Sequence, residues 1–300
     1  MTKDGVEHWV NAFEALRPRL LGIAYRVLGS YSEAQDVVQD TFLLWMKADR
    51  GSIQSPTAWL VTACTRKAID TLRSARVSRV DYVGVWLPEP IESRYLKEKE
   101  ADEDLAETAT LAFLVVLETL APKERAAYVL RDIFGLSFAE VAESLAVSEQ
   151  ACRKLVSRAR ANIQSPSRPR RATLAEQKAT VSAFERAIHT GDTAALKQRF
   201  SEDVRLTADS GGKVVAIRRP MDGRIQVLQF IEKVLCPAWR EGNLVRQVLN
   251  AQPSLVLMEK GRPTAAIVFG YDELGQARDV FITRNPEKLT SVHSGRSSSQ

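Results

Sequence analysis

The sequence of 300 residues has few of the residues that build disulfides, metal centres or acid–base catalysts, with only three cysteines and three histidines. Cys64, Cys152 and Cys236 lie far apart along the chain and match no metal-ligand spacing. Cys64 and Cys152 fall at apolar positions of predicted helices, so we expect reduced thiols that serve packing, as in a cytoplasmic protein. The sequence therefore predicts neither a metal nor another cofactor.

Long apolar runs are missing as well. No segment approaches the roughly 20 apolar residues that a membrane-spanning helix needs, and the first residues, MTKDGVEHW, lack the pattern of a signal peptide. We therefore expect no membrane partner. The net charge of +5 is only mildly basic, so the distribution of charge says more than its sum.

Residues 136–163, LSFAEVAESLAVSEQACRKLVSRARANI, have the pattern of two helices joined by a tight turn. Ser137 and Glu140 form a capping box at the start of the first helix, residues 146–148 form the turn, and Ser148 is placed to cap the second helix. One face of the second helix is apolar at helical spacing. Its other faces carry the side chains of Gln150, Arg153, Lys154, Ser157 and Arg158.

These polar groups suit a recognition helix in the DNA major groove, because Arg and Gln carry forked hydrogen-bonding groups that read base edges. Seven basic and no acidic residues lie between Arg153 and Arg171, a stripe that favours contact with phosphates. The alternative is an ordinary helical hairpin with a solvated basic face.

A helix is predicted after the break at residues 29–32, with Ser32 as its cap. Pro18, inside the preceding helical pattern, should kink or restart that helix. The new helix carries an acidic stripe that is either a solvated face or a protein-docking surface. The polar residues on this stripe are Glu33, Asp36, Gln39 and Asp40.

A third helix should begin with Ser55 as N-cap and Pro56 as first helical residue. Trp59 lies near its start, and the far end is basic. An aromatic ring followed by cationic groups suits single-stranded nucleic acid, although a lone Trp on a helix also fits a core position. The basic residues in question are Arg66, Lys67 and Arg73.

The second half of the chain changes in character. Residues 80–108 read as an extended linker leading into an acidic helix, and the basic, proline-containing residues 164–173 mark the main boundary. Helices are then expected at 174–188, 193–200 and 224–235, and strands at 204–207, 214–217, 245–249, 255–258, 264–269 and 279–282. Helices followed by a curved antiparallel sheet indicate a cone-shaped α+β domain.

Taken together, these stretches resemble an extracytoplasmic-function (ECF) sigma factor of bacterial RNA polymerase. The resemblance in domain two rests on AYRVLGSYSEAQDVVQDTF and SPTAWLVTACTRKAIDTLR. In domain four it rests on LAPKERAAYVLRDIFGLSFAEVAESLAVSEQACRKLVSRAR. The last stretch is specific, because a helix-turn-helix alone does not require LxPxER or the upstream DVVQDTF.

Three further motifs are similar to those of the SigJ-like subgroup, whose members carry a C-terminal SnoaL-like (NTF2-like) extension. They are YVGVWLPEP at residues 82–90, with Val85 at the usual proline, DSGGK at 209–213 and NPEKL at 285–289. The implied fold is multidomain: two all-α sigma domains, the second with the helix-turn-helix, and a C-terminal α+β cone domain.

The expected boundaries are sigma domain two at 7–80, a linker at 81–107, sigma domain four at 108–165, the SnoaL-like regulatory domain at 172–290 and a disordered tail at 291–300. Domain two should bind core RNA polymerase, at the clamp of its β′ subunit, through Asp36, Gln39 and Asp40. It should read the −10 promoter element through Trp59, Arg66, Lys67 and Arg73.

Domain four should contact the β flap and read the −35 element through Gln150, Arg153, Lys154, Ser157 and Arg158. The subgroup also implies regulation from within the chain, with no separate anti-sigma factor. The apolar Trp86, Leu87 and Pro88 of the linker should pack on the extension, unless the extension is freely tethered. The extension residues expected there are Asp209, Gly211, Gly212, Lys213, Asn285, Pro286, Lys288 and Leu289.

Two rival functions compete with this interpretation. A helix-turn-helix repressor with a ligand-binding domain would have no use for the domain-two stretch and is normally a two-fold dimer. An enzyme, as some SnoaL-like proteins are, requires an acid or base in its pocket. The extension offers only His189 and His293, with Asp209 and Asp222 as candidate acids, so we expect no enzymatic activity.

Overall fold

The computed structural model describes residues 3–49, 51, 53–95, 108–163 and 172–292. They form two compact units. The helical unit contains the described residues up to 80, residue 108 and residues 116–163, whereas the sheet unit contains residues 81–95, 109–115 and 172–292. The acidic helix expected before residue 107 falls mostly on residues 96–107, outside the described residues, as do residues 293–300 of the expected disordered tail. The first two residues of that expected tail, Ser291 and Val292, are instead buried in the sheet unit.

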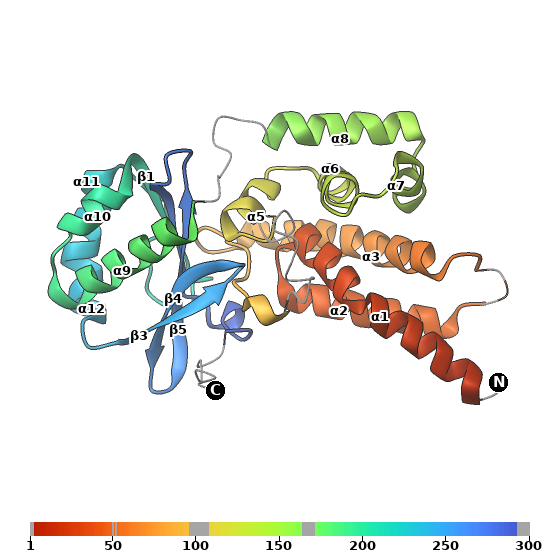
Figure 1. The fold of residues 1–300 in the computed structure, drawn as a ribbon, viewed down its shortest axis with the longest axis horizontal. Coiled ribbons are helices and arrows are strands. Elements are labelled where there is room, and N and C mark those ends of the chain that lie inside the picture. The colour runs from red at the N-terminus through yellow and green to blue at the C-terminus, as the bar shows by residue number, and fades with distance from the viewer. Residues whose placement is uncertain (1–2, 50, 52, 96–107, 164–171, 293–300) are drawn as a thin grey trace. The chain divides into compact units, whose positions relative to one another are not determined.

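Three long helices build the first part of the helical unit (Figure 1). Their bounds are α1 (Lys3–Leu28), α2 (Tyr31–Lys47) and α3 (Pro56–Ser78). They bury one another's apolar faces, and Leu20, Ile23 and Leu60 are fully inaccessible to solvent. Helix α1 continues through Pro18 without a restart, because packing against α2 and α3 outweighs the one backbone hydrogen bond that proline removes.

Helix starts follow the capping signals closely. Ser55 accepts a hydrogen bond from the backbone N of Ala58 at 3.3 Å, and Pro56 opens α3, as predicted. The expected cap of α2 was wrong by two residues. Gly29 ends α1 with a φ of 71°, and this leaves Ser30 in the extended conformation that a cap needs. Ser30 accordingly accepts from the backbone N of Glu33.

The second part of the helical unit contains the helix-turn-helix. It is built from α6 (Pro122–Tyr128), a π-turn (Val129–Ile133), α7 (Phe138–Leu145) and α8 (Glu149–Ile163). Ser137 and Glu140 form the predicted capping box, with the two reciprocal bonds at 3.2 and 2.7 Å. Ala146 turns the chain in the left-handed conformation, and Ser148 caps α8. The predicted helix-turn-helix is confirmed.

The sheet unit is an α+β domain. Its helices are α9 (Leu174–Thr190), α10 (Ala194–Arg199), α11 (Arg224–Phe230), a π-turn (Ile231–Leu235) and α12 (Cys236–Trp239). Its strands are β1 (Phe200–Asp209), β2 (Met221–Asp222), β3 (Asn243–Leu249), β4 (Gln252–Glu259), β5 (Arg262–Tyr271) and β6 (Ala277–Thr283). The order is β2-β1-β6-β5-β4-β3, with β1 and β6 parallel and the other pairs antiparallel.

Five of the six expected strands are present, but residues 214–217 form none. The free edge of β1 pairs instead with the two-residue strand β2, at Arg205 and Leu206. The positive φ angles of Gly211 and Gly212 turn the chain away from β1 before residue 214. Apolar composition alone therefore gave a wrong strand.

Both faces of this sheet are buried. Leu206, Leu255 and Ile267 pack under helices α9–α12, which cover one face (Figure 1). Val256, Ala266 and other alternate residues form a second cluster on the opposite face. That cluster includes Leu87 and residues from the start of α5 (Leu111–Leu117), so the segments 81–95 and 109–115 cover the outer face.

In the described part of the chain, we find no helix with the length and hydropathy needed to cross a membrane. The three cysteines are buried as free thiols.

Candidate functional site

The polar residues of α8 lie as the sequence suggests. Cys152 and Val156 are buried on the inner face of the helix, whereas all five predicted −35 residues are exposed. Such a helix presents its polar side chains without loss of its own packing. The exposed residues are Gln150, Arg153, Lys154, Ser157 and Arg158.

Arg153 is held in place by α7. Its guanidinium lies 4.2 Å from the ring centroid of Phe138, and Arg131 lies over the same ring at 4.6 Å. Glu149 is 3.5 Å away on the preceding turn of α8. Cation–π contacts of this kind limit the freedom of the side chain. Phe138 was not singled out from the sequence, and its only signal is its place directly after the cap Ser137.

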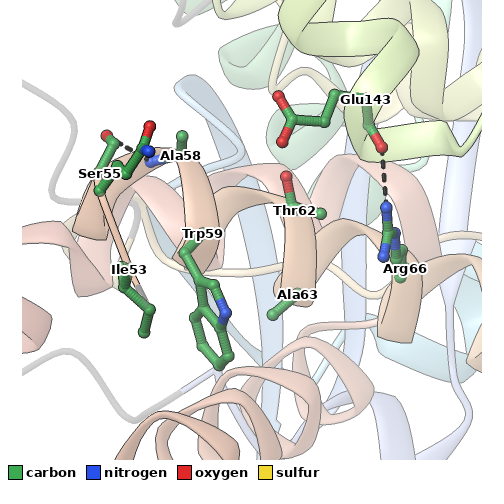
Figure 2. A pocket seen from close by; sticks show the side chains of 9 residues that line it. Ile53, Ser55, Ala58, Trp59, Thr62, Ala63, Arg66 and Glu143 are labelled. Carbon is green, nitrogen blue, oxygen red and sulfur yellow. Dashed lines mark hydrogen bonds between the residues drawn. The ribbon is translucent and has the colours of Figure 1, made fainter. Parts of the chain in front are cut away.

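A pocket of about 510 Å³ opens at the start of α3 (Figure 2). Trp59 lines it and also packs on the buried Trp45, with ring centroids 5.3 Å apart. The indole is thus a partial core residue with one side on the pocket. Gln54, Ser55 and Glu143 are also on the pocket wall.

Glu143 belongs to α7, so the helix-turn-helix closes one side of this pocket. Arg66 donates from Nη2 to the carbonyl of Glu143 at 2.8 Å (Figure 2). Its Nε donates to the carbonyl of Ser144 at 3.0 Å. The hydroxyls of Thr62 and Ser144 are 3.0 Å apart. These carbonyls are at the C-terminal end of α7, where a cation is favoured by the helix dipole.

Two other cationic residues of α3 have different surroundings. Lys67 forms an ion pair with Asp40 of α2 at 2.8 Å. The hydrogen bond to Asp40 and the charge of its carboxylate raise the pKa of Lys67. Arg73 is exposed and lies 3.5 Å from Asp70 on its own helix. The ion pair thus joins a predicted −10 residue to a predicted polymerase residue, which sequence reasoning did not foresee.

Asp36 and Gln39 are exposed on α2 beside Asp40. Leu43 and Leu44, one turn further along, are each 49% exposed. Residues four apart lie on the same face of a helix, so the acidic stripe continues into an apolar patch. The sequence interpretation missed these leucines because it assigned inward positions to the apolar residues around them.

In the sheet unit, Asp209 is the centre of the contacts between the linker and the extension. Its fully buried carboxylate accepts from the Tyr82 hydroxyl at 2.5 Å and from the backbone N of Leu87 at 2.8 Å. Lys288 Nζ lies 2.6 Å from the same carboxylate and donates to the carbonyl of Leu87 at 2.5 Å. The ammonium also sits 4.0 Å from the centroid of the Trp86 ring. We call these five residues the linker clamp.

Asn285 and the turn at Gly211 and Gly212 lie next to the linker clamp. Asn285 donates from Nδ2 to the Tyr82 hydroxyl at 2.9 Å, and its Oδ1 caps the short helix Pro286–Lys288. A Cβ on Gly211 would lie 2.6 Å from Asn285 Nδ2, and one on Gly212 would lie 2.9 Å from Val83 Cβ. Only glycine permits this approach. Burial, followed by hydrogen bonding to Asp209, raises the pKa of Tyr82.

The other extension residues expected at the linker differ in their surroundings. Leu289 is buried in the same cluster as Leu87, and Pro88 is also buried. Pro286 is exposed, and Lys213 forms an ion pair with Glu287. The extension does pack on the linker as predicted.

Sequence reasoning missed a second anchor, Asn250, at the turn between β3 and β4. Its Oδ1 accepts from the backbone N of Ile91 at 3.1 Å, and its Nδ2 donates to the carbonyl of Ala109 at 3.0 Å. Asn250 therefore ties both covering segments to the sheet. An Asn at a predicted turn was its only signal.

Comparison with known proteins gives matches along most of the chain. The model of sigma-70 region 2 matches residues 12–77, and that of sigma-70 region 4 matches residues 110–163. The ECF RNA polymerase sigma factor SigJ of Mycobacterium tuberculosis (strain ATCC 25618 / H37Rv) is 39% identical over 228 residues, 74% of this chain and 72% of that protein.

The probable ECF RNA polymerase sigma factor SigI of Mycobacterium tuberculosis (strain CDC 1551 / Oshkosh) is 29% identical over 281 residues, 93% of each protein. The crystal structure of M. tuberculosis SigJ superposes with a TM-score of 0.72 at 32% identity, covering 94% of this chain and 98% of that one. The two sigma regions, the helix-turn-helix and this similarity, which extends through the α+β domain, establish that the chain belongs to the ECF RNA polymerase sigma factors.

Proposed function

We propose that this sigma factor binds core RNA polymerase, directs it to promoters through α3 and α8, and is regulated from within the chain by its SnoaL-like domain. The observation that carries the regulatory part is the linker clamp, in which a buried ion pair of the extension holds the segment between the two sigma domains. Sigma factors are transcription factors rather than enzymes, and the proposal requires no catalytic residue.

For the −35 element, the proposed division of labour follows side-chain chemistry. Gln150 and Arg153 read base edges, because the paired donors of Arg match the two acceptors of guanine and the donor and acceptor of Gln match adenine in the major groove. Lys154 and Arg158 hold phosphates, and Ser157 adds a backbone contact. The stacking of Arg153 on Phe138 supports its role, since a restrained side chain loses less entropy on binding.

For the −10 element, we propose that an unstacked base enters the pocket beside Trp59, with Arg66, Lys67 and Arg73 along the strand. Stacking on an aromatic ring contributes roughly 1–3 kcal/mol per base. In the free chain Arg66 is occupied by the end of α7. Promoter opening would therefore require α7 to move away from α3. Arg66 cannot hydrogen-bond the carbonyls of α7 and contact the DNA strand at the same time.

For the polymerase, Asp36, Gln39 and Asp40 would offer their polar groups to basic side chains of the β′ clamp. Lys67 must then share or release Asp40. We propose that domain four contacts the β flap and that the extension takes the place of a separate anti-sigma protein. The site of action is the cytoplasm, where the polymerase is.

The general proposal is tested by reconstitution with core polymerase. A stoichiometric complex and run-off transcripts from a cognate promoter are expected from the full chain. A protein that binds DNA as a dimer and never associates with core polymerase would refute the proposal and favour the repressor.

The regulatory proposal is tested by a matched pair of substitutions in the full chain. Gly212→Ala places a Cβ 2.9 Å from Val83 of the linker, whereas Gly261→Ala, at a similar φ, points into open space. The backbone strain of about 1–2 kcal/mol is shared by both, so a difference between the two reports the linker contact. Hydrogen exchange of residues 82–90 should rise in Gly212→Ala alone.

Run-off transcription should then change for Gly212→Ala and not for Gly261→Ala. A rise in transcription means that the docked linker holds the factor inactive, and a fall means that it maintains an active spacing of the two DNA readers. Faster linker exchange without any change in transcription refutes regulation through this contact.

A further inference from the structure

An apolar cavity of about 330 Å³ lies between the sheet and the helices of the sheet unit. Ala208 of β1 and Ile282 of β6 form its floor, and Phe230, Leu235 and Trp239 form the helical wall. Its volume is at the lower end of the roughly 300–1,000 Å³ typical of small-molecule sites. None of the residues that line it is acidic.

Residues 215–217, which failed to form the expected strand, supply the remaining wall. Val215 and Val234 both line the cavity and are 88% and 48% exposed. Exposed aliphatic side chains at an opening in an apolar wall are characteristic of a site that accepts an apolar body. This segment is therefore better explained as a cavity wall than as a lost strand.

Arg284 is the charged residue at this cavity. Its Nη1 donates to the carbonyl of Val215 at 2.7 Å, while its Nε is buried with no hydrogen-bond partner. Among the described residues, no carboxylate lies within ion-pair distance of its guanidinium. A permanent cation at the wall of an apolar cavity, with donors beyond the one that Nη1 gives to Val215, favours an anionic group in that cavity.

The cavity also adjoins the linker clamp through the backbone. Ala208 and Asp209 are neighbours on β1, and Arg284 and Asn285 are neighbours after β6, so in each pair one residue lines the cavity and the other contacts the linker. Successive residues of a strand point to opposite faces. The backbone N atoms of Arg284 and Asn285 both donate to the carbonyl of Asp209, at 2.6 and 3.0 Å.

We propose that this cavity binds a small, mainly apolar carboxylate, with the carboxylate on Arg284 and the apolar body against Trp239 and Phe230. A carboxylate matches the forked donors of a guanidinium. Its binding fixes Arg284 and thereby the junction with Asp209 on which the linker clamp is built. Occupancy of the cavity therefore slows exchange of the linker.

Isothermal titration of the full chain with octanoate, and with 1-octanol as the neutral analogue of equal length, tests the binding. Octanoate should bind saturably at one site. Octanol should bind at least tenfold more weakly, because its hydroxyl has no charge and cannot accept from two guanidinium donors at once. Arg284→Met should weaken the binding of octanoate by a similar factor. Arg262→Met, on the exposed β4–β5 hairpin, should leave that binding unchanged.

Ala238→Phe, at an exposed position of α12 that lines the cavity, enlarges a lining side chain and leaves Arg284 unchanged, so it should also abolish binding. Equal affinity for octanoate and octanol, no binding of octanoate, or unchanged binding in Ala238→Phe would each overturn the proposal. Octanoate that binds but leaves the exchange of residues 82–90 unchanged overturns the coupling to the linker. Both measurements use neither polymerase nor promoter, so their failure is distinct from failure of the proposed function.

Discussion

The ion pair of Asp209 and Lys288 should dominate the stability of the docked linker. Asp209→Asn keeps the shape of the side chain and one acceptor oxygen but removes the negative charge. Lys288, only 10% exposed at its side chain, would then lose the carboxylate that lies 2.6 Å from its ammonium, beside the Leu87 carbonyl and the Trp86 ring. A buried charge without its partner is strongly destabilising.

The expected magnitude follows from the burial of both partners. Removing one member of a buried pair costs roughly 3–5 kcal/mol, and we take about 3 kcal/mol because the amide oxygen still accepts one hydrogen bond. Since about 1.4 kcal/mol is a factor of ten, the linker should open about two orders of magnitude more often. Hydrogen exchange at the backbone N of Leu87, which donates to Asp209, measures this opening directly.

Asp222→Asn is the matched control. It breaks the ion pair with Arg205 in the same domain, whose side chains are 60% and 55% exposed, and such exposed pairs contribute about 1 kcal/mol or less. The double variant Asp209→Asn with Lys288→Met should recover part of the loss, because both buried charges are then gone. If Asp209→Asn speeds exchange at Leu87 no more than Asp222→Asn does, the clamp is not held by this ion pair.

Three further predictions concern other parts of the chain. Arg153→Ala should reduce the free energy of binding to the −35 element by roughly 1–3 kcal/mol and relax the base preference at one position. Lys154→Ala should weaken binding to all DNA sequences alike and reduce the slope of log K against log salt concentration by about one. Binding titrations at several salt concentrations, on cognate and mutated sites, distinguish the two results. Charge reversal at Asp36 and Asp40 together should abolish core binding with the melting temperature preserved, and wild-type pull-down by that variant would refute the assignment. Burial raises the pKa of Asp279 from 3.8 to about 6. The folded chain thus holds this proton more tightly than the unfolded chain, so stability falls as pH rises from about 4 to about 6 and is level above that range. Asp279→Asn should remove this slope and add up to about 3 kcal/mol at pH 7.5, and urea titrations from pH 4.5 to 7.5 in which both proteins lose stability equally would contradict it.

The sequence by itself determined the local elements of this protein. The helix starts at Ser55 and Ser137 can be predicted because each side chain accepts a hydrogen bond from the backbone N three residues later. The apolar spacing of α8 predicts which of its residues are exposed. These signals are readable because cause and effect lie within a few residues of one another.

Tertiary structure decided which of these residues share partners. Nothing in the local pattern tells that Arg66 caps α7 or that Lys67 pairs with Asp40. Asp209 is the buried acceptor for Tyr82 and Leu87, which lie more than a hundred residues earlier in the chain. Residues 214–217 have the composition of a strand, but they form none, and residues 215–217 line a cavity instead. Long-range hydrogen bonds and ion pairs depend on which surfaces the fold brings together, and periodicity within one segment carries no information about that choice.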